Sequence, residues 1–148
     1  MTDYNVMPDY QTRRKIINDI CEKYSFVHHS FAGKSVCGRC IDVLHIGNTK
    51  NCVLYCAGFH GSEYLTVTAV LKFFEQCADA MENDSVVGRY KIRDFLREKG
   101  LTIVPCVNPD GVEIAIHGSD AALKYKALVE KASKENKGLA GKRKGCGH

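Results

Sequence analysis

The sequence contains no apolar run long enough to cross a membrane. A transmembrane helix needs about 20 consecutive apolar residues, and no stretch of the chain approaches that length. The first ten residues, MTDYNVMPDY, also lack the basic start and apolar core of a secretory signal peptide. These absences predict a cytoplasmic protein that does not act at a membrane.

The cysteines lack the spacing of a disulfide framework or a cysteine-based metal site. Cys37 and Cys40 form one C-x-x-C pair across a predicted hairpin turn, and no second pair follows at ligand spacing. In a cytoplasmic protein we expect free thiols. Four cysteines in apolar surroundings are interpreted as small buried hydrophobic residues: Cys52, Cys56, Cys77 and Cys106.

Basic residues are concentrated near the C-terminus, but no nucleic-acid-binding pattern accompanies them. The formal net charge is +4, and residues 124–144 hold eight Lys and Arg against two Glu. Aromatic residues are not interleaved with these charges and no known binding motif appears. We therefore predict an irregular, solvated basic tail over about residues 137–148 and no nucleic-acid partner.

The composition is that of one globular domain spanning residues 1–148, with 45% hydrophobic and 26% charged residues. Helical periodicity predicts helices over about 9–24, 64–81 and 88–99 and, after an N-cap at Ser119 or Asp120, over a segment ending near 136. The second should be largely buried. The core positions of the third are Tyr90, Ile92, Phe95 and Leu96, with Gly100 ending it.

Strand-like segments alternate with these helices. Residues 26–36 and 40–46 flank Gly38 as a hairpin would. Residues 52–57 are apolar throughout, as expected of a strand buried on both faces, and residues 101–107 form another short buried strand. The pattern predicts an α/β fold with a mixed sheet that contains parallel strands, is opened by an N-terminal hairpin and is flanked by helices.

Two polar loops follow the two buried strands, and ligands of such sheets bind beyond the carboxyl ends of strands. His60 and Glu63 lie in the first loop, and imidazole nitrogen and carboxylate oxygen are both zinc ligands. Alone, such a pair is more often a surface hydrogen-bonded pair. The second loop, Asn108-Pro109-Asp110-Gly111, is typical of a tight turn.

Together, FHGSE (residues 59–63) and VNPDGVE (residues 107–113) resemble the zinc carboxypeptidases of the carboxypeptidase A-like superfamily. Residues 31–44 resemble the opening hairpin of that family, and the likeness covers about residues 25–120. It implies an incomplete carboxypeptidase-like fold, His60 and Glu63 as ligands of Zn²⁺, and residues 108–111 as a structural loop beside the site. The substrate of the intact enzyme would be a peptide cleaved at its C-terminus, or a cell-wall-type peptide.

The resemblance also shows what the sequence does not supply. The family uses a third zinc ligand, a distant His, then a Glu that acts as general base, with Arg and Asn residues that hold the substrate carboxylate. None has a counterpart here, and His148 comes too early to be that ligand. We therefore expect a truncated polypeptide that is inactive by itself.

Two other functions are consistent with the sequence. One is a non-catalytic α/β module that forms homo-oligomers through an exposed sheet edge. The other is a relative of the amino-acid acylases and deacylases, which also use a His-Gly-x-Glu loop. The complete Asn108-Pro109-Asp110-Gly111 loop favours the peptidases.

The segment from Leu139 to His148 has neither helical periodicity nor a cap pattern. One permitted set of codons for it, read one base later, translates as Trp-Gln-Ala-Asn-Ala-Arg-Gly-Val-Asp. This resembles a stretch that the family usually has at this distance beyond Asn-Pro-Asp-Gly. The hypothesis is that the segment is a frameshifted form of that motif, the alternative being a genuine basic C-terminus. Sequencing the coding DNA through codons 139–148 distinguishes the two.

Overall fold

The computed structural model describes residues 2–142, with side chains for residues 2–135. The predicted α/β class is confirmed. The elements in chain order are α1 (Tyr10–Lys23), β1 (His28–Lys34), β2 (Cys40–Ile46), β3 (Cys52–Cys56), the 3-10 helix η1 (Gly61–Glu63), α2 (Tyr64–Glu82), β4 (Val86–Val87), β5 (Tyr90–Lys91), α3 (Ile92–Glu98), β6 (Gly100–Val104), α4 (Pro109–His117), the 3-10 helix η2 (Ser119–Tyr125) and α5 (Lys126–Lys142).

Four strands form one mixed sheet in the order β1-β2-β6-β3. The β1–β2 and β2–β6 pairs are antiparallel, whereas β3 and β6 run parallel. Gly38 lies in the β1–β2 turn with φ of +83°, a conformation that glycine adopts without steric cost. The predicted opening hairpin and parallel strands are therefore confirmed.

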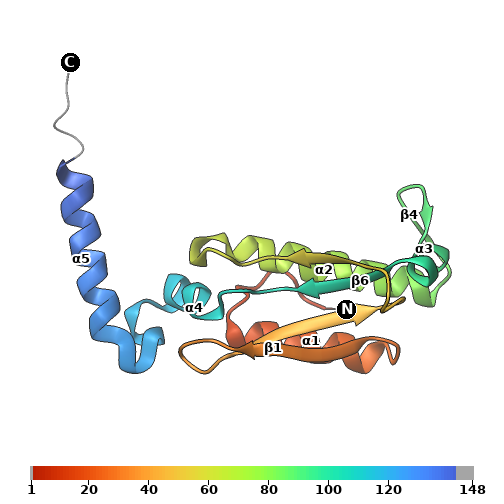
Figure 1. Ribbon diagram of the computed structural model, residues 1–148, viewed down its shortest axis with the longest axis horizontal. Coiled ribbons are helices and arrows are strands. Elements are labelled where there is room, and N and C mark those ends of the chain that lie inside the picture. Colours follow the sequence, from red (N-terminus) through yellow and green to blue (C-terminus); the bar gives the residue numbers. More distant parts are fainter. Residues whose placement is uncertain (1, 143–148) are drawn as a thin grey trace, which may run out of the picture.

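Helices α1 and α2 pack against the same face of the sheet (Figure 1). Strand side chains alternate between faces, and the register places Leu44 beside Ile103 on the face that the helices cover. Tyr24 at the end of α1 donates a hydrogen bond to Asp79 of α2 (3.1 Å), which ties the two helices together. The core is made by Ile16, Ile17, Ile20, Leu44, Ile46, Val67, Leu71, Phe74, Leu101 and Ile103.

Strand β3 lies at the edge of this sheet, and the prediction that it is buried on both faces is wrong. All five of its residues are exposed, including Leu54 at 57%, because β3 pairs with β6 on one side only and its outer side has no neighbouring strand among the described residues. Cys52 and Cys56 are therefore exposed rather than buried.

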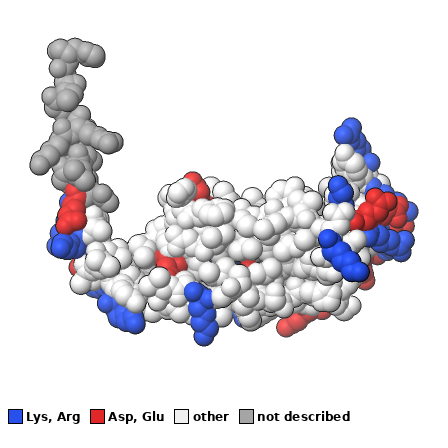
Figure 2. All heavy atoms as spheres, in the orientation of Figure 1, with Lys and Arg blue, Asp and Glu red and all other residues white. Residues whose placement is uncertain are grey.

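Figure 2 shows that the body of the molecule carries few charged side chains in this view.

The prediction that α2 is largely buried is also wrong. Phe74 and Leu71 are fully buried against the sheet, but Leu65 is 72% exposed and Phe73 is 38% exposed. The helix is apolar nearly all round, yet only one of its faces meets the sheet within the described residues. The structure therefore exposes apolar surface on α2 beside the open edge of β3.

The helix predicted over 88–99 is shorter than expected. Gly88 has φ of +62° and lies in the turn of the β4–β5 hairpin, so α3 begins only at Ile92. Ile92 and Leu96 are buried as predicted, whereas Tyr90 and Phe95 are exposed. Gly100 begins β6, and Lys99 is the C-cap.

The C-terminal half differs most from the prediction. Helix α4 was not predicted. The final α-helix does not start after Ser119 or Asp120: the 3-10 helix η2 begins at Ser119, and α5 begins only at Lys126. Helix α5 projects away from the sheet (Figure 1). Because α5 extends to Lys142, the irregular segment does not begin at residue 137, and the remainder of the predicted basic tail, 143–148, lies outside the described residues.

Among residues 2–142, no helix combines the length and the apolar character that crossing a bilayer requires.

Candidate functional site

The two predicted loops lie side by side because they follow β3 and β6, the parallel pair of strands. Backbone hydrogen bonds between the two segments continue beyond the ends of the strands. The Val107 amide donates to the Ala57 carbonyl (2.9 Å), and the Asn108 amide donates to the Gly58 carbonyl (2.9 Å). The structure thus brings residues 58–63 next to residues 108–111, as the sequence pattern predicted.

Two glycines allow the loops to touch through their backbones. A Cβ atom on Gly61 would lie 2.1 Å from the carbonyl oxygen of Gly111, which is far inside van der Waals contact. The Asn108 Nδ2 atom donates a hydrogen bond to the Phe59 carbonyl (3.1 Å) across the same contact. The FHGSE loop therefore rests directly on the start of α4.

The Asn108–Gly111 segment is the beginning of a helix, so its interpretation as a tight turn is wrong. Asn108 is the N-cap of α4, and its Oδ1 atom accepts a hydrogen bond from the Gly111 amide (2.9 Å). Pro109 occupies the first helical turn, where its missing N–H costs nothing. An N-cap Asn followed by Pro is itself a helix-start signal, and it was available in the sequence.

His60 is the N-cap of η1 and Glu63 is its last residue, just beyond the carboxyl end of β3, and both are exposed. The Glu63 amide donates to the His60 carbonyl (3.0 Å), so the short helix fixes their separation along the chain. Among the side chains of residues 2–135, none forms a hydrogen bond or an ion pair with the imidazole of His60 or the carboxylate of Glu63. Nothing within that range occupies either group.

This pair suits zinc chemically but supplies only part of a site. Catalytic zinc usually takes three protein ligands of the His, Asp, Glu or Cys type and leaves one position open for water. Within the described residues no group of three or more such side chains is placed to hold a metal. Glu63 also precedes the N-terminus of α2, where the helix dipole favours a negative charge.

Asp110 binds the β1–β2 turn. Its carboxylate accepts hydrogen bonds from the Ser35 hydroxyl (2.8 Å), the Cys37 amide (2.9 Å) and the Arg39 guanidinium (2.7 Å). Burial alone would raise the pKa of Asp110, but these bonds outweigh it and hold the pKa below its usual value. Asp110 is thus an ionised anchor for the hairpin.

Arg39 links the same turn to two further segments. Its Nη2 atom donates to the Ala121 carbonyl (2.8 Å) in η2 and lies 3.7 Å from the buried Glu113 of α4. Arg39 lies within residues 31–44, which resemble the opening hairpin of the family, but the sequence predicts no contact for it. Its role depends on three segments far apart in the chain, and no local pattern marks such a contact.

The profile of the family described as zinc carboxypeptidase (Peptidase_M14) matches residues 14–139. The chain belongs to the zinc carboxypeptidase family. Its sequence is 29% identical over 130 residues to gamma-D-glutamyl-L-diamino acid endopeptidase 1 of Lysinibacillus sphaericus, covering 86% of this chain and 33% of the relative. It is 36% identical over 109 residues to uncharacterized protein YqgT of Bacillus subtilis (strain 168), covering 72% of this chain and 29% of that protein.

Solved structures agree on the fold of this zinc carboxypeptidase chain. Carboxypeptidase A from Helicoverpa armigera superposes with a TM-score of 0.64 at 21% sequence identity, over 80% of this chain and 28% of that one. The likeness shows a carboxypeptidase fold, of which the chain covers only part. The predicted resemblance and the incomplete carboxypeptidase-like fold are therefore confirmed.

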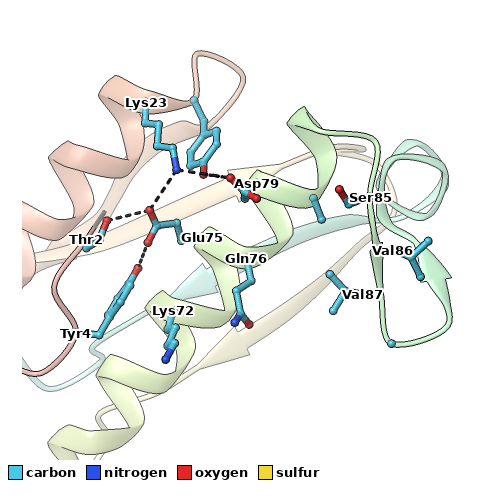
Figure 3. Close-up of a pocket in the computed structure, with 13 residues that line it drawn as sticks. Thr2, Tyr4, Lys23, Lys72, Glu75, Gln76, Asp79, Ser85, Val86 and Val87 are labelled. Atoms are coloured by element: carbon cyan, nitrogen blue, oxygen red, sulfur yellow. Dashed lines mark hydrogen bonds and ion pairs between the residues drawn. The ribbon is translucent and has the colours of Figure 1, made fainter.

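A hollow of about 580 Å³ on this zinc carboxypeptidase chain lies apart from the two loops, and none of their residues lines it (Figure 3). Several of its polar groups bond to one another. Glu75 of α2 accepts hydrogen bonds from the Tyr4 hydroxyl (2.6 Å) and the Thr2 hydroxyl (2.9 Å), and Lys23 lies 3.6 Å from Asp79. Burial and the neighbouring Glu75 raise the pKa of Tyr4. These contacts fasten the N-terminal segment to α2.

Proposed function

We propose that His60 and Glu63 are two zinc ligands of a peptidase site, as the family membership of the chain implies. The observation that carries this proposal is a pair of side chains that have no hydrogen-bond or ion-pair partner among residues 2–135, on a loop held against the start of α4. His60 and Glu63 would hold the zinc ion, which when bound would supply polarisation of the scissile carbonyl and a lower pKa of a bound water. The chain's own part is to hold an imidazole and a carboxylate at the carboxyl end of β3.

The substrate of the whole enzyme is proposed to be a peptide, cleaved at its C-terminus or within a cell-wall-type peptide. The first relative is named as an endopeptidase for gamma-D-glutamyl-L-diamino acid bonds, which supports the second kind of substrate. This chain spans 33% of that relative's length. General acid–base catalysis contributes about 10²–10⁴-fold. The Glu that acts as general base in the family has no counterpart in this sequence, so we propose that the 148-residue chain is inactive by itself.

Zinc calorimetry tests the metal site. We expect the purified chain to bind Zn²⁺, and His60→Ala and Glu63→Gln each to weaken that binding at least 10-fold. His117→Ala is the matched control, because His117 is also exposed but its ring is hydrogen-bonded to Asp9 (3.1 Å). Equal zinc affinity in the wild type and His60→Ala would contradict the assignment.

Hydrolysis assays test the activity and separate it from that of an acylase. The metal-loaded chain is expected to cleave neither a C-terminal peptide substrate nor an N-acyl amino acid. Peptide hydrolysis that His60→Ala abolishes would overturn the proposed inactivity. Hydrolysis of the N-acyl amino acid alone would instead favour the acylase relatives, although the family match favours peptide bonds.

A second function, self-association, is favoured by the edge of β3. The Ala57 amide and the Asn51 carbonyl bond to β6. Since backbone groups alternate along a strand, those of Cys52, Leu54 and Cys56 point outward. The strand carries no charge, and charge is the usual protection of an exposed edge. We propose that a second copy pairs antiparallel with this edge about a two-fold axis at Leu54.

This register has a distinctive chemical signature. Cys52 of one copy would lie opposite Cys56 of the other, with Cα atoms about 5.5 Å apart, a separation that a disulfide spans. With every other cysteine replaced by serine, Cys52→Ser and Cys56→Ser should each fail to cross-link alone under copper-phenanthroline oxidation, whereas their mixture should yield a dimer. A mixture that stays monomeric, like the separate variants, would rule out this pairing.

A further inference from the structure

We infer that the β1–β2 turn acts as a clamp that positions the metal-binding loop, with Arg39 and Asp110 as its positioning residues. The inference rests on the proposed zinc-binding role of His60 and Glu63. Neither Arg39 nor Asp110 touches that pair in the structure; both act through the start of α4. The path from the clamp to the loop has two steps.

The first step joins the turn to α4. Asp110 lies in the first turn of α4, and its carboxylate receives donors from three positions of the hairpin turn: Ser35, Cys37 and Arg39. Both side chains of the ion pair are largely buried, at 12% exposure for Arg39 and 14% for Asp110. Hydrogen bonds between ionised groups are the stronger kind, so this contact fixes the helix start to the sheet.

The second step joins the helix start to the loop. Asn108 caps α4 through the Gly111 amide and at the same time donates to the Phe59 carbonyl, next to His60. Gly111 in turn presses its carbonyl against Gly61, with no space for a methyl group between them. Any shift of the first turn of α4 is therefore passed to the backbone on both sides of His60.

Arg39 also prevents a charge conflict at the clamp. Asp110 and Glu113 lie three positions apart on α4, and the guanidinium lies within ion-pair distance of both. Removing the cation leaves two partly buried carboxylates without their shared partner, which favours movement of the helix start. Lysine at position 39 would keep the charge but lose the planar fork that reaches both Asp110 and the Ala121 carbonyl.

The test follows the His60 ring by NMR during a Zn²⁺ titration of the full chain. Residues that orient metal ligands typically change metal affinity about 10–100-fold. We expect this loss of zinc affinity in Arg39→Met and Asp110→Asn, with Arg39→Lys intermediate. The control is Ile20→Val, a fully buried core change that lowers stability without touching the clamp. Unchanged affinity in Arg39→Met, or an equal loss in Ile20→Val, would overturn the clamp.

A wild type that binds no zinc would contradict the proposed function but not the clamp. Hydrogen exchange of the loop amides tests the clamp in that case. The Asn108 and Glu63 amides are bonded to Gly58 and His60. Under conditions that favour folding, we expect Arg39→Met to accelerate their exchange at least 10-fold more than Ile20→Val does. Equal exchange rates in these two variants would refute the clamp, whatever the zinc result.

Discussion

Two regions of the sheet differ in how many of their polar and apolar groups have partners among the described residues. At the α4 corner, the hairpin turn, the helix start and the FHGSE loop are joined by hydrogen bonds from Asp110 and Asn108. At the β3 edge, apolar side chains and outward backbone groups face solvent. The comparison shows that an ordered half-site does not depend on a closed sheet: His60 follows the edge strand β3, but the contacts described for its loop come from the start of α4 and not from the outer side of β3.

Helix α2 has one face in the core and another beside β3, so neighbouring phenylalanines in it should differ most. Phe74 is fully buried, and replacing a core Phe by Ala costs about 3–5 kcal/mol. Phe73 is 38% exposed, and its ring centroid lies 5.8 Å from that of Tyr55. Phe73→Ala should therefore lower the free energy of unfolding by less than half as much. Urea denaturation of both variants measures the difference. Equal losses would mean that the β3 side is packed as well as the core.

Gly61→Ala should disrupt the contact between the FHGSE loop and the start of α4. The new methyl group would collide with the Gly111 carbonyl, and overpacking of this kind costs about 1–3 kcal/mol. The expected result is a lower free energy of unfolding together with weaker zinc binding. Ser62→Ala is the control, since Ser62 is exposed and its change should leave both quantities nearly unaltered. A neutral Gly61→Ala would show that the loops are not in close contact.

The smallest effect is a pH dependence at the clamp. Hydrogen bonds hold the pKa of Asp110 below its usual value in the folded state, against about 3.9 when unfolded. A depressed pKa stabilises the fold above the unfolded pKa, and that stability is lost as pH falls through the folded pKa. The difference in unfolding free energy between the wild type and Asp110→Asn should therefore stay constant above about pH 5 and shrink below about pH 4. A constant difference down to about pH 3 would contradict the anchoring role.

The sequence predicted the features that depend on short-range patterns. Ile16, Ile17 and Ile20 at helical spacing identified α1, and Gly38 identified the hairpin. The apolar runs gave both parallel strands, and the family resemblance implied that residues 108–111 lie beside the loop of His60 and Glu63. Strong periodicity and the common edge of parallel strands are enough for these conclusions.

Features that depend on distant partners were missed. An apolar strand has the same pattern at the edge and in the middle of a sheet, so the exposure of Leu54 could not be read from residues 52–57. Asn108-Pro109-Asp110-Gly111 fits both a turn and a helix start, and the helix is decided by the Asn108 cap and by packing against Gly61. The contact of Arg39 with Asp110 joins segments from both halves of the chain.

Amide hydrogen exchange of the dilute monomer tests the contrast between the two sides most directly. We predict slow exchange for the Asn108 and Cys37 amides, which are bonded at the α4 corner. Along β3, Tyr55 faces β6 and should exchange slowly, whereas the outward amide of Leu54 should exchange fast. If Leu54 were as protected as Tyr55 at high dilution, or Asn108 as unprotected as Leu54, the account of one ordered side and one open side would be wrong.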